Sequence, residues 1–310
     1  MHPAASIIFF TTASGLGYGL MAWAGILAAF GQMPLHRGLG IGVMVTALVL
    51  VSTGLLSSLL HLGRPERAWR ALSQWRSSWL SREAVAAILT FIPATVFAGA
   101  WIFLDHLSRL AGVFTALGAL ITVYCTAMIY RSLTPIKQWS NPTTVPVYLA
   151  LSLMTGATWL HAFLLAFGAG SARTVLITGA VAVISIPAGY TLKRRAWHYD
   201  PTPAATIQSA TGLGGTDIRS VEWPHTEENF LLKEMGYRVA RKHAERLRQI
   251  ATGAGFIAPL LLLVVTAGRQ DWLATAAAIL AAIVMAAGIT VERWLFFAEA
   301  KHTVALYYGR

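Results

Sequence analysis

Eight long runs of mostly apolar residues constrain the fold of this protein more than any other feature. A helix needs roughly 20 such residues to cross the hydrocarbon core of a membrane. Charged residues make up only 12% of the sequence, about half of what a soluble domain carries. The sequence therefore predicts an all-α integral membrane protein, a bundle of eight transmembrane helices. The predicted spans are 5–30, 40–62, 84–105, 109–131, 145–169, 173–192, 251–268 and 272–297.

Lysine and arginine are distributed unevenly between the loops that join these spans. One side holds Arg64, Arg67, Arg70, Arg76, Arg82, Arg131, Lys137, Lys193, Arg194 and Arg195. The other side holds little more than Arg37, Arg109, Arg173 and Arg269. Cytoplasmic loops carry an excess of these residues. We therefore expect a multi-pass protein of a bacterial inner membrane with both termini in the cytoplasm.

The spans divide the sequence into three parts. Residues 1–192 carry the first six helices, and residues 251–310 carry helices seven and eight with a C-terminal tail. Between them, 193–250 forms a long cytoplasmic loop that ends in a predicted basic amphipathic helix, beginning near Thr226. That helix either lies on anionic lipid headgroups or docks a partner subunit, and the sequence leaves both open.

Composition and motifs exclude several function classes. The single cysteine, Cys125, excludes a disulfide framework and an iron–sulfur cluster held by this chain alone, which needs about four thiolates. No Walker loop, dinucleotide fingerprint or zinc-ligand spacing occurs. We expect membrane lipids and protein subunits as partners, and no nucleic acid.

Chemistry is concentrated in the segment "HLGRPERAWRALSQWRSSWLSRE", residues 61–83, between spans two and three. His61 ends one span and Glu83 stands at the entrance of the next, so antiparallel helices place both groups at similar depth. An imidazole titrates near neutrality, and burial tunes a carboxyl group. Together they suit the exchange of protons with a quinone. The alternative is ordinary anchoring, because Trp and Arg are enriched at membrane interfaces.

The other groups of the predicted quinone site surround these two. Arg64 and Arg67 are expected to bond a quinone carbonyl or to hold Glu83 ionised. The run "IYRSLTPIKQW", residues 129–139, adds the hydroxyl of Tyr130 for the second carbonyl, with Trp139 nearby. The indoles predicted to line a cleft for an isoprenoid tail are Trp69, Trp75 and Trp79.

Two further polar positions lie inside predicted spans. His161 lies toward the outer half of its span, whereas His61 lies at the inner edge, so the two are poorly placed to ligate a haem together. We therefore interpret His161 as a hydrogen-bonded structural residue and expect no haem in this chain. Glu292 and Arg293 are expected to neutralise one another, because an unpaired charge in the bilayer is costly.

With its "HLG…SRE" and "IYRSLTPIKQW" runs, the sequence resembles the membrane-anchor subunits of the dimethyl sulfoxide reductase type. The resemblance implies an eight-helix anchor that holds a molybdopterin catalytic subunit and a four-cluster, ferredoxin-like iron–sulfur subunit. It implies that His61 is the quinol-site histidine, and that Gly63, Arg67 and Glu83 lie near that site. The long 193–250 loop and the C-terminal "ALYYGR" depart from the enterobacterial pattern.

The excess of Arg and Lys on one side favours one group within this family. It places the partner subunits in the cytoplasm, as in the related sulfite dehydrogenase complexes, where sulfite oxidation delivers electrons to ubiquinone or menaquinone. The protein is then a quinone-reactive subunit that is not catalytic alone. The alternatives are the anchor of a dimethyl sulfoxide reductase that oxidises menaquinol, a purely structural tether, and a membrane transporter. Few ionisable groups at mid-depth and no matched pair of broken helices disfavour the transporter.

Overall fold

The computed structural model describes residues 5–59, 64–199, 207–213, 218, 221–222, 243–300 and 302–303. Eight helices in this part of the protein are long and apolar enough to cross a membrane, which confirms the predicted fold class. Six of these spans are each one α-helix: α1 (Ala5–Ala29), α4 (Trp79–Phe103), α5 (Arg109–Arg131), α6 (Thr144–Ala166), α7 (Ala172–Trp197) and α13 (Trp272–Ala298).

The remaining two spans each contain one π-helical turn. The span Arg37–Leu59 consists of α2 (Arg37–Gly40), η1 (Ile41–Val45) and α3 (Thr46–Leu59). The span Ala244–Val265 consists of α11 (Ala244–Thr252), η3 (Gly253–Ile257) and α12 (Ala258–Val265). Within the described residues, two short helices lie outside the spans: the 3-10 helix η2 (Pro65–Gln74) and α8 (Ile207–Thr211).

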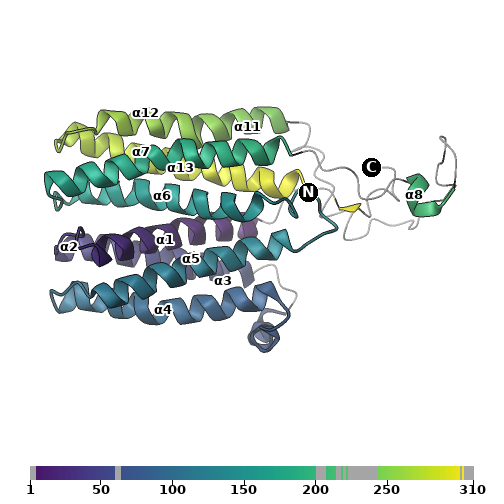
Figure 1. The fold of residues 1–310 in the computed structure, drawn as a ribbon, viewed down its shortest axis with the longest axis horizontal. Helices are drawn as coiled ribbons and strands as arrows, with labels where there is room; N and C mark the ends of the chain where they lie inside the picture. Colours follow the sequence, from purple (N-terminus) through teal and green to yellow (C-terminus); the bar gives the residue numbers. More distant parts are fainter. Residues whose placement is uncertain are drawn as a thin grey trace.

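Helices α1 and α6 form the centre of the bundle (Figure 1). They are also its most buried spans, and α1 contacts α3, α5, α6 and α13. Helices α3, α4 and α5 lie on one side of α1, and α7, α12 and α13 lie on the far side of α6 (Figure 1). Two groups of helices thus meet across a central pair.

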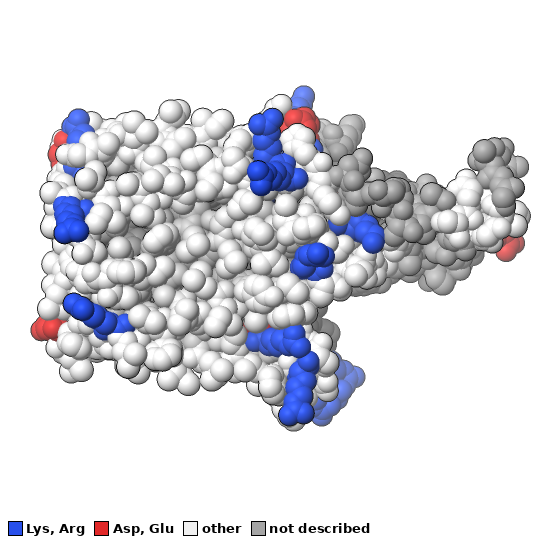
Figure 2. Space-filling view, in the orientation of Figure 1, with Lys and Arg blue, Asp and Glu red and all other residues white. Residues whose placement is uncertain are grey.

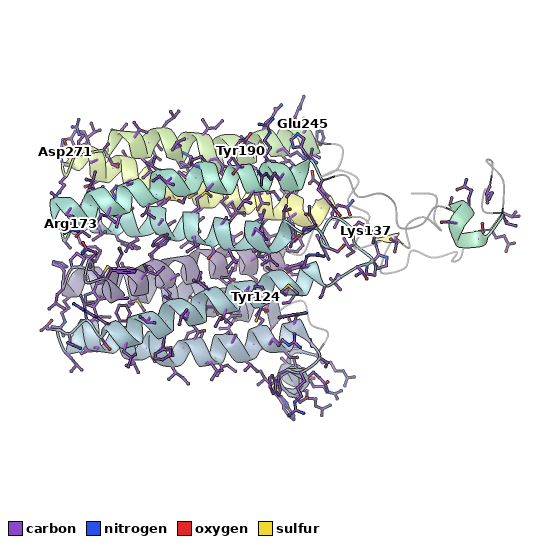
Figure 3. The ribbon with its side chains drawn as sticks, in the orientation of Figure 1. Tyr124, Lys137, Arg173, Tyr190, Glu245 and Asp271 are labelled. Carbon is purple, nitrogen blue, oxygen red and sulfur yellow. The ribbon has the colours of Figure 1, made fainter. Side chains whose placement is uncertain are left out.

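Charge divides the bundle into two ends. The basic end holds Arg64, Arg67, Arg70, Arg76, Arg82, Arg131, Lys137, Arg194, Arg195, Arg246 and Arg248. The far end holds Arg37, Arg109, Arg173 and Arg269, with Asp105 and Asp271 beside them. Figure 2 shows the long middle of the bundle free of charge on the face in view, and Figure 3 shows Lys137 and Glu245 at one end and Arg173 and Asp271 at the other. This is the asymmetry that the positive-inside rule describes.

The helices that begin at the two ends of the bundle differ in their N-terminal capping. At the far end, α2, α5, α7 and α13 each begin at a residue whose side chain accepts a backbone N–H bond: His36, Ser108, Ser171 and Asp271. The Arg269 guanidinium also bonds Asp271 and lowers the pKa of that carboxyl. At the basic end, α4, α6 and α11 have no side-chain cap of this kind. The protein's own side chains therefore cap the helix N-termini at the far end but not those at the basic end.

Glycine lets the two central helices touch backbone to backbone. A Cβ on Gly19 would lie 1.9 Å from the carbonyl oxygen of Ser152, and a Cβ on Gly156 would lie 2.1 Å from the carbonyl carbon of Gly19. The Ser152 hydroxyl donates to the carbonyl of Gly15 across the same crossing, at 2.6 Å. Small residues are the usual means of close helix approach in membranes. Gly19 and Gly156 thus allow α1 and α6 to approach closely.

Several helix ends differ from the predicted ones. Helix α4 begins at Trp79, which places Glu83 inside the helix and not before it. Helix α7 continues to Trp197, so Lys193, which the sequence assigns to a cytoplasmic loop, is a buried helical residue. Helix α11 begins at Ala244, so the last turns of the predicted amphipathic helix belong to the seventh span. The rest of that predicted helix, including Thr226, lies outside the described residues.

The α1–α6 crossing gives a stability test. We expect Gly19→Ala to lower the free energy of unfolding by about 1–3 kcal/mol or more, because the new Cβ meets backbone that cannot move aside. The control is Gly99→Ala in α4, where a Cβ meets nothing within 4 Å. Thermal unfolding of the detergent-solubilised protein measures both. Equal unfolding temperatures for the two variants would contradict this packing.

Candidate functional site

In the described part of the loop before α4, residues 64–78, most side chains are exposed at the basic end. His61 and Gly63, two residues of the predicted site, lie outside the described residues. Arg64 and Arg67 are exposed, and the nearest acidic contact of Arg67 is Glu66, at 3.9 Å between Nε and Oε1. No described cation forms an ion pair with Glu83. The described residues therefore show no ion pair between Glu83 and either Arg64 or Arg67.

Arg82 fixes the end of this loop onto α4. Its Nε donates to the carbonyl of Trp75 at 3.0 Å, and its Nη2 donates to the carbonyl of Arg76 at 2.7 Å. Its guanidinium stacks 4.2 Å from the centroid of the Trp79 ring, a cation–π contact. Trp79 in turn packs edge-on against Tyr124 of α5. Trp79 is therefore held as a rigid wall at the mouth of the α4–α5 interface.

An apolar groove runs along α4 and α5 from this wall. Its volume is about 930 Å³, and it extends from Trp75 and Arg82 at the basic end to Ser108 at the far end. Leu89, Ile92, Phe114 and Ile121 are among the apolar side chains that line it. Of the three indoles predicted to line a tail cleft, Trp75 lines this groove, Trp79 stands beside it through Arg82, and Trp69 is 68% exposed on η2.

Glu83 is the buried acid of the site. Its side chain lies on the second turn of α4, facing α5, and the residue is only 4% exposed. The hydroxyl of Thr126 lies within hydrogen-bond distance of its Oε1. A carboxyl group taken out of water needs such a partner, because a buried polar group without one is costly. Burial and a hydroxyl partner thus replace the ion pair that the sequence suggested.

The Thr126 hydroxyl suits either protonation state of Glu83. It also lies 3.0 Å from the carbonyl of Thr122. With an ionised carboxylate, Thr126 donates to Glu83. With a protonated carboxyl, Glu83 donates to Thr126, and Thr126 donates to the Thr122 carbonyl. The pair can therefore gain or lose a proton while the hydrogen bond between Glu83 and Thr126 is kept.

Sequence reasoning missed Thr122 and Thr126, although a signal was present. These two residues and Tyr130 recur every four positions along α5, which puts them on one face of the helix. Glu83 faces the same stripe through Thr126. A polar stripe in an otherwise apolar span marks a buried polar layer.

Tyr130 and Trp139 are brought together, as predicted, but inside an aromatic cluster. The Tyr130 ring lies 5.3 Å from Trp139, 5.7 Å from Tyr148 and 5.4 Å from Phe296, between ring centroids. The Trp139 indole donates to the carbonyl of Phe296 at 2.9 Å. Trp139 therefore ties the α5–α6 loop to α13, and Tyr130 stands between this cluster and the Thr126 stripe.

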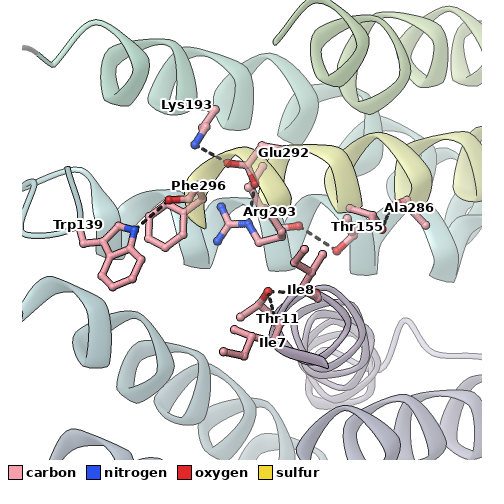
Figure 4. A network of polar contacts seen from close by, with 12 residues as sticks. Ile7, Ile8, Thr11, Trp139, Thr155, Lys193, Ala286, Glu292, Arg293 and Phe296 are labelled. Carbon is pink, nitrogen blue, oxygen red and sulfur yellow. Dashed lines mark hydrogen bonds and ion pairs between the residues drawn. The ribbon is translucent and has the colours of Figure 1, made fainter. Parts of the chain in front are cut away.

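A buried ionic triad lies across the bundle from Glu83. Glu292 of α13 pairs with its neighbour Arg293, at 2.5 Å between Oε2 and Nε, and with Lys193 of α7 (Figure 4). All three residues are at most 3% exposed. The Arg293 guanidinium also lies 4.2 Å from the centroid of the Tyr148 ring. The predicted Glu292–Arg293 neutralisation is confirmed, and Lys193 is the member that the sequence missed.

This triad predicts an asymmetric response to mutation. Lys193→Met leaves one anion paired with one cation, so we expect a small loss of stability. Glu292→Gln leaves two buried cations without a counter-ion, and we expect a loss of about 3–5 kcal/mol. Thermal unfolding of the two variants side by side measures the difference. A larger loss for Lys193→Met than for Glu292→Gln would refute this description of the triad.

His161 is a buried structural residue, as predicted. Its Nδ1 lies 3.0 Å from the hydroxyl of Thr178, and its Nε2 lies 3.0 Å from the hydroxyl of Thr266. Both ring nitrogens therefore serve to join α6 to α7 and to the end of α12. Within the described ranges, no group of three or more His, Cys, Asp or Glu side chains is arranged to hold a metal ion.

Comparison with known proteins identifies the family. The model of the DMSO reductase anchor subunit (DmsC) family matches residues 1–309. The chain belongs to the DMSO reductase anchor subunit family. This anchor is 33% identical to a sulfite dehydrogenase subunit of Allochromatium vinosum, over 99% of both proteins. It is 28% identical to a subunit of the anaerobic dimethyl sulfoxide reductase of Haemophilus influenzae, over 40% of its own length and 45% of the relative's.

The family assignment fixes the coarse role of the protein. It is a multi-pass membrane anchor subunit of a multi-subunit oxidoreductase complex of the DMSO reductase type. This result favours the anchor over the transporter among the functions that the sequence left open.

Proposed function

We propose that this anchor exchanges electrons and protons with a quinone at the mouth of the α4–α5 interface. The observation that carries the proposal is the environment of Glu83, a buried carboxyl whose Thr126 partner accommodates both protonation states. A bound quinone supplies the redox chemistry, since two electrons and two protons convert it to quinol. Glu83 holds or releases one of these protons, and His61, by its place in the sequence, handles the other.

The groove beside Glu83, which is lined by the adjacent Arg82 and not by Glu83 itself, suits a lipid-soluble carrier. The groove between α4 and α5 is apolar, opens along the bilayer and begins at Trp75 and Arg82, beside the Trp79 wall. An isoprenoid tail matches its length and chemistry. Tyr130 and the exposed Arg64 and Arg67 are the remaining donors that we assign to the head group, with Gly63 allowing close approach and Trp139 bracing Tyr130.

We assign the basic end to the cytoplasm and to the partner subunits. The excess of Arg and Lys at that end follows the positive-inside rule. The basic end is also where Glu83 lies, so a cluster-bearing iron–sulfur subunit docked there brings its electrons beside the site. A molybdopterin subunit would complete the complex on the same side.

Sulfite oxidation is the reaction that we favour for the complex. The Allochromatium vinosum relative, a sulfite dehydrogenase subunit, aligns over 99% of both proteins. The Haemophilus influenzae relative, from a dimethyl sulfoxide reductase, aligns over 40% of this anchor. Electrons would then pass from sulfite through the partner subunits to ubiquinone or menaquinone. In the alternative, menaquinol is oxidised here and dimethyl sulfoxide is reduced by the partner.

Substitutions at Glu83 and His61 test the quinone site. We expect Glu83→Gln and His61→Ala each to lower quinone-linked turnover about 100-fold or more, because a general acid–base group is removed. Complex assembly and electron transfer to or from an artificial dye should stay near the wild-type level, since the catalytic subunit is untouched. Steady-state assays of the purified complex with both acceptors measure these effects.

The matched control is Glu245→Gln, which removes an exposed carboxyl at the same end of the bundle. It should leave both activities unchanged. Normal quinone kinetics in Glu83→Gln and His61→Ala would leave a purely structural tether as the role of this protein. Loss of dye activity together with quinone activity would point to failed assembly and would also count against the site.

A further inference from the structure

A small buried cavity lies between α1, α5, α6 and α13. Its volume is about 20 Å³, enough for about one water molecule. Among the residues that line it, the buried hydroxyl of Thr12 has no hydrogen-bond partner in the protein, and the hydroxyls of Tyr18 and Tyr148 have Thr122 and Arg293 nearby without well-formed hydrogen-bond geometry. Buried polar groups in native proteins almost always bond to protein or to ordered water. The size and the polar lining of the cavity thus suit one bound water molecule.

A larger pocket opens at the basic end beside this cavity. Its volume is about 340 Å³, and it lies between α6, α7, α11 and α13. Polar and charged side chains line it, including Asn141, Thr144, Lys193, Arg248 and Glu299. Tyr148 lines both the pocket and the small cavity. Tyr148 thus stands between the small cavity and the large pocket, whose lining is partly polar and partly apolar.

The small cavity reaches the candidate quinone site on its other side. Thr126 lines it, and the Thr126 hydroxyl is the hydrogen-bond partner of Glu83. The triad borders the same route, because Lys193 lines the large pocket and Arg293 lines the small cavity (Figure 4). Residues with polar side chains therefore border both cavities, from the large pocket to the partner of Glu83.

These groups occupy one level of the bundle. Glu83 and Tyr148 lie four residues after the starts of α4 and α6, and Lys193 lies four residues before the end of α7. Thr126 and Arg293 lie five residues before the ends of α5 and α13. At 1.5 Å per residue, all five lie roughly 6–8 Å inside the basic end. The connection runs sideways across the bundle and does not cross the membrane.

We propose that this layer is a proton path that supplies Glu83 from the large pocket. The inference rests on the proposed function at Glu83. A proton enters at the pocket, and the Tyr148 hydroxyl, the cavity water and the Thr126 hydroxyl each accept one hydrogen and pass one on. Arg293, whose guanidinium lies 4.2 Å from the centroid of the Tyr148 ring, orients the relay. Reduction of one quinone consumes two protons and two electrons, and the electrons come from the iron–sulfur partner.

The pocket lies away from the surface at which we dock the iron–sulfur subunit. Glu83 is 4% exposed, and a subunit docked beside the Trp79 wall would cover its rim. The pocket lies on the other side of α1 and α6, among α7, α11 and α13 (Figure 1). Protons can therefore reach Glu83 without passing through the surface that receives electrons.

The test removes the Tyr148 hydroxyl in the assembled complex. We expect Tyr148→Phe to lower quinone-linked turnover about 10-fold or more, with dye-linked activity and the KM for quinone unchanged. Millimolar azide, whose neutral acid carries protons into apolar regions, should restore much of the rate without changing dye-linked activity. The matched control is Tyr190→Phe, because Tyr190 packs against Phe256 and lines neither the pocket nor the cavity (Figure 3).

A second pair of variants covers the case in which Tyr148→Phe fails to assemble. Thr126→Val removes the relay hydroxyl with little change in volume, and Thr126→Ser restores it. We expect a rate loss that azide relieves in Thr126→Val and near-normal turnover in Thr126→Ser. If Glu83→Gln is slow while Tyr148→Phe and Thr126→Val turn over normally, or if azide fails to restore them, the path is wrong and the quinone site stands. If Glu83→Gln turns over normally, both proposals fall.

Discussion

A carboxyl group buried inside a lipid-embedded bundle is the constraint on which the rest of this structure depends. Glu83 is 4% exposed, and no described cation pairs with it, so its stability rests on the hydroxyl of Thr126. That bond requires α4 and α5 to hold a fixed register. The register is set from the centre of the bundle, where glycine contacts let α1 lie directly against α5 and α6. The protein thus uses tight backbone packing to hold a few polar groups in place.

The two ends of the bundle are built for different surroundings. The far end has helix starts capped by its own side chains, and one of its few arginines, Arg269, pairs with the capping residue Asp271. Within the described residues, the basic end carries an excess of arginine, helix starts without side-chain caps, the buried carboxyl of Glu83 and the buried ionic triad around Glu292. Such an end suits contact with partner subunits and proton exchange, whereas the far end needs neither. The basic end therefore suits the proposed chemistry, and the far end suits anchoring in the membrane.

The sequence predicted what depends on composition and missed what depends on packing. Hydropathy alone located all eight spans, and the need to neutralise charge predicted the Glu292–Arg293 pair. Lys193 was missed because the end of α7 extends one turn beyond the apolar run, where α13 supplies the counter-ion. Thr126 was missed because a threonine within an apolar span is unremarkable until the facing residue is known to be Glu83. The sequence left two roles open for Arg64 and Arg67, a bond to a quinone carbonyl or an ion pair with Glu83, and among the described residues the acidic contact of Arg67 is Glu66.

The central claim is that Glu83 changes its protonation state with the quinone. Redox-induced infrared difference spectroscopy of the purified complex in quinone-containing vesicles observes this directly, through the carbonyl stretch of a protonated carboxyl group. We predict a carbonyl band that changes between the oxidised and reduced states in the wild type and disappears in the Glu83→Gln complex. Difference spectra in which the wild type and Glu83→Gln show the same carboxyl bands would contradict the account.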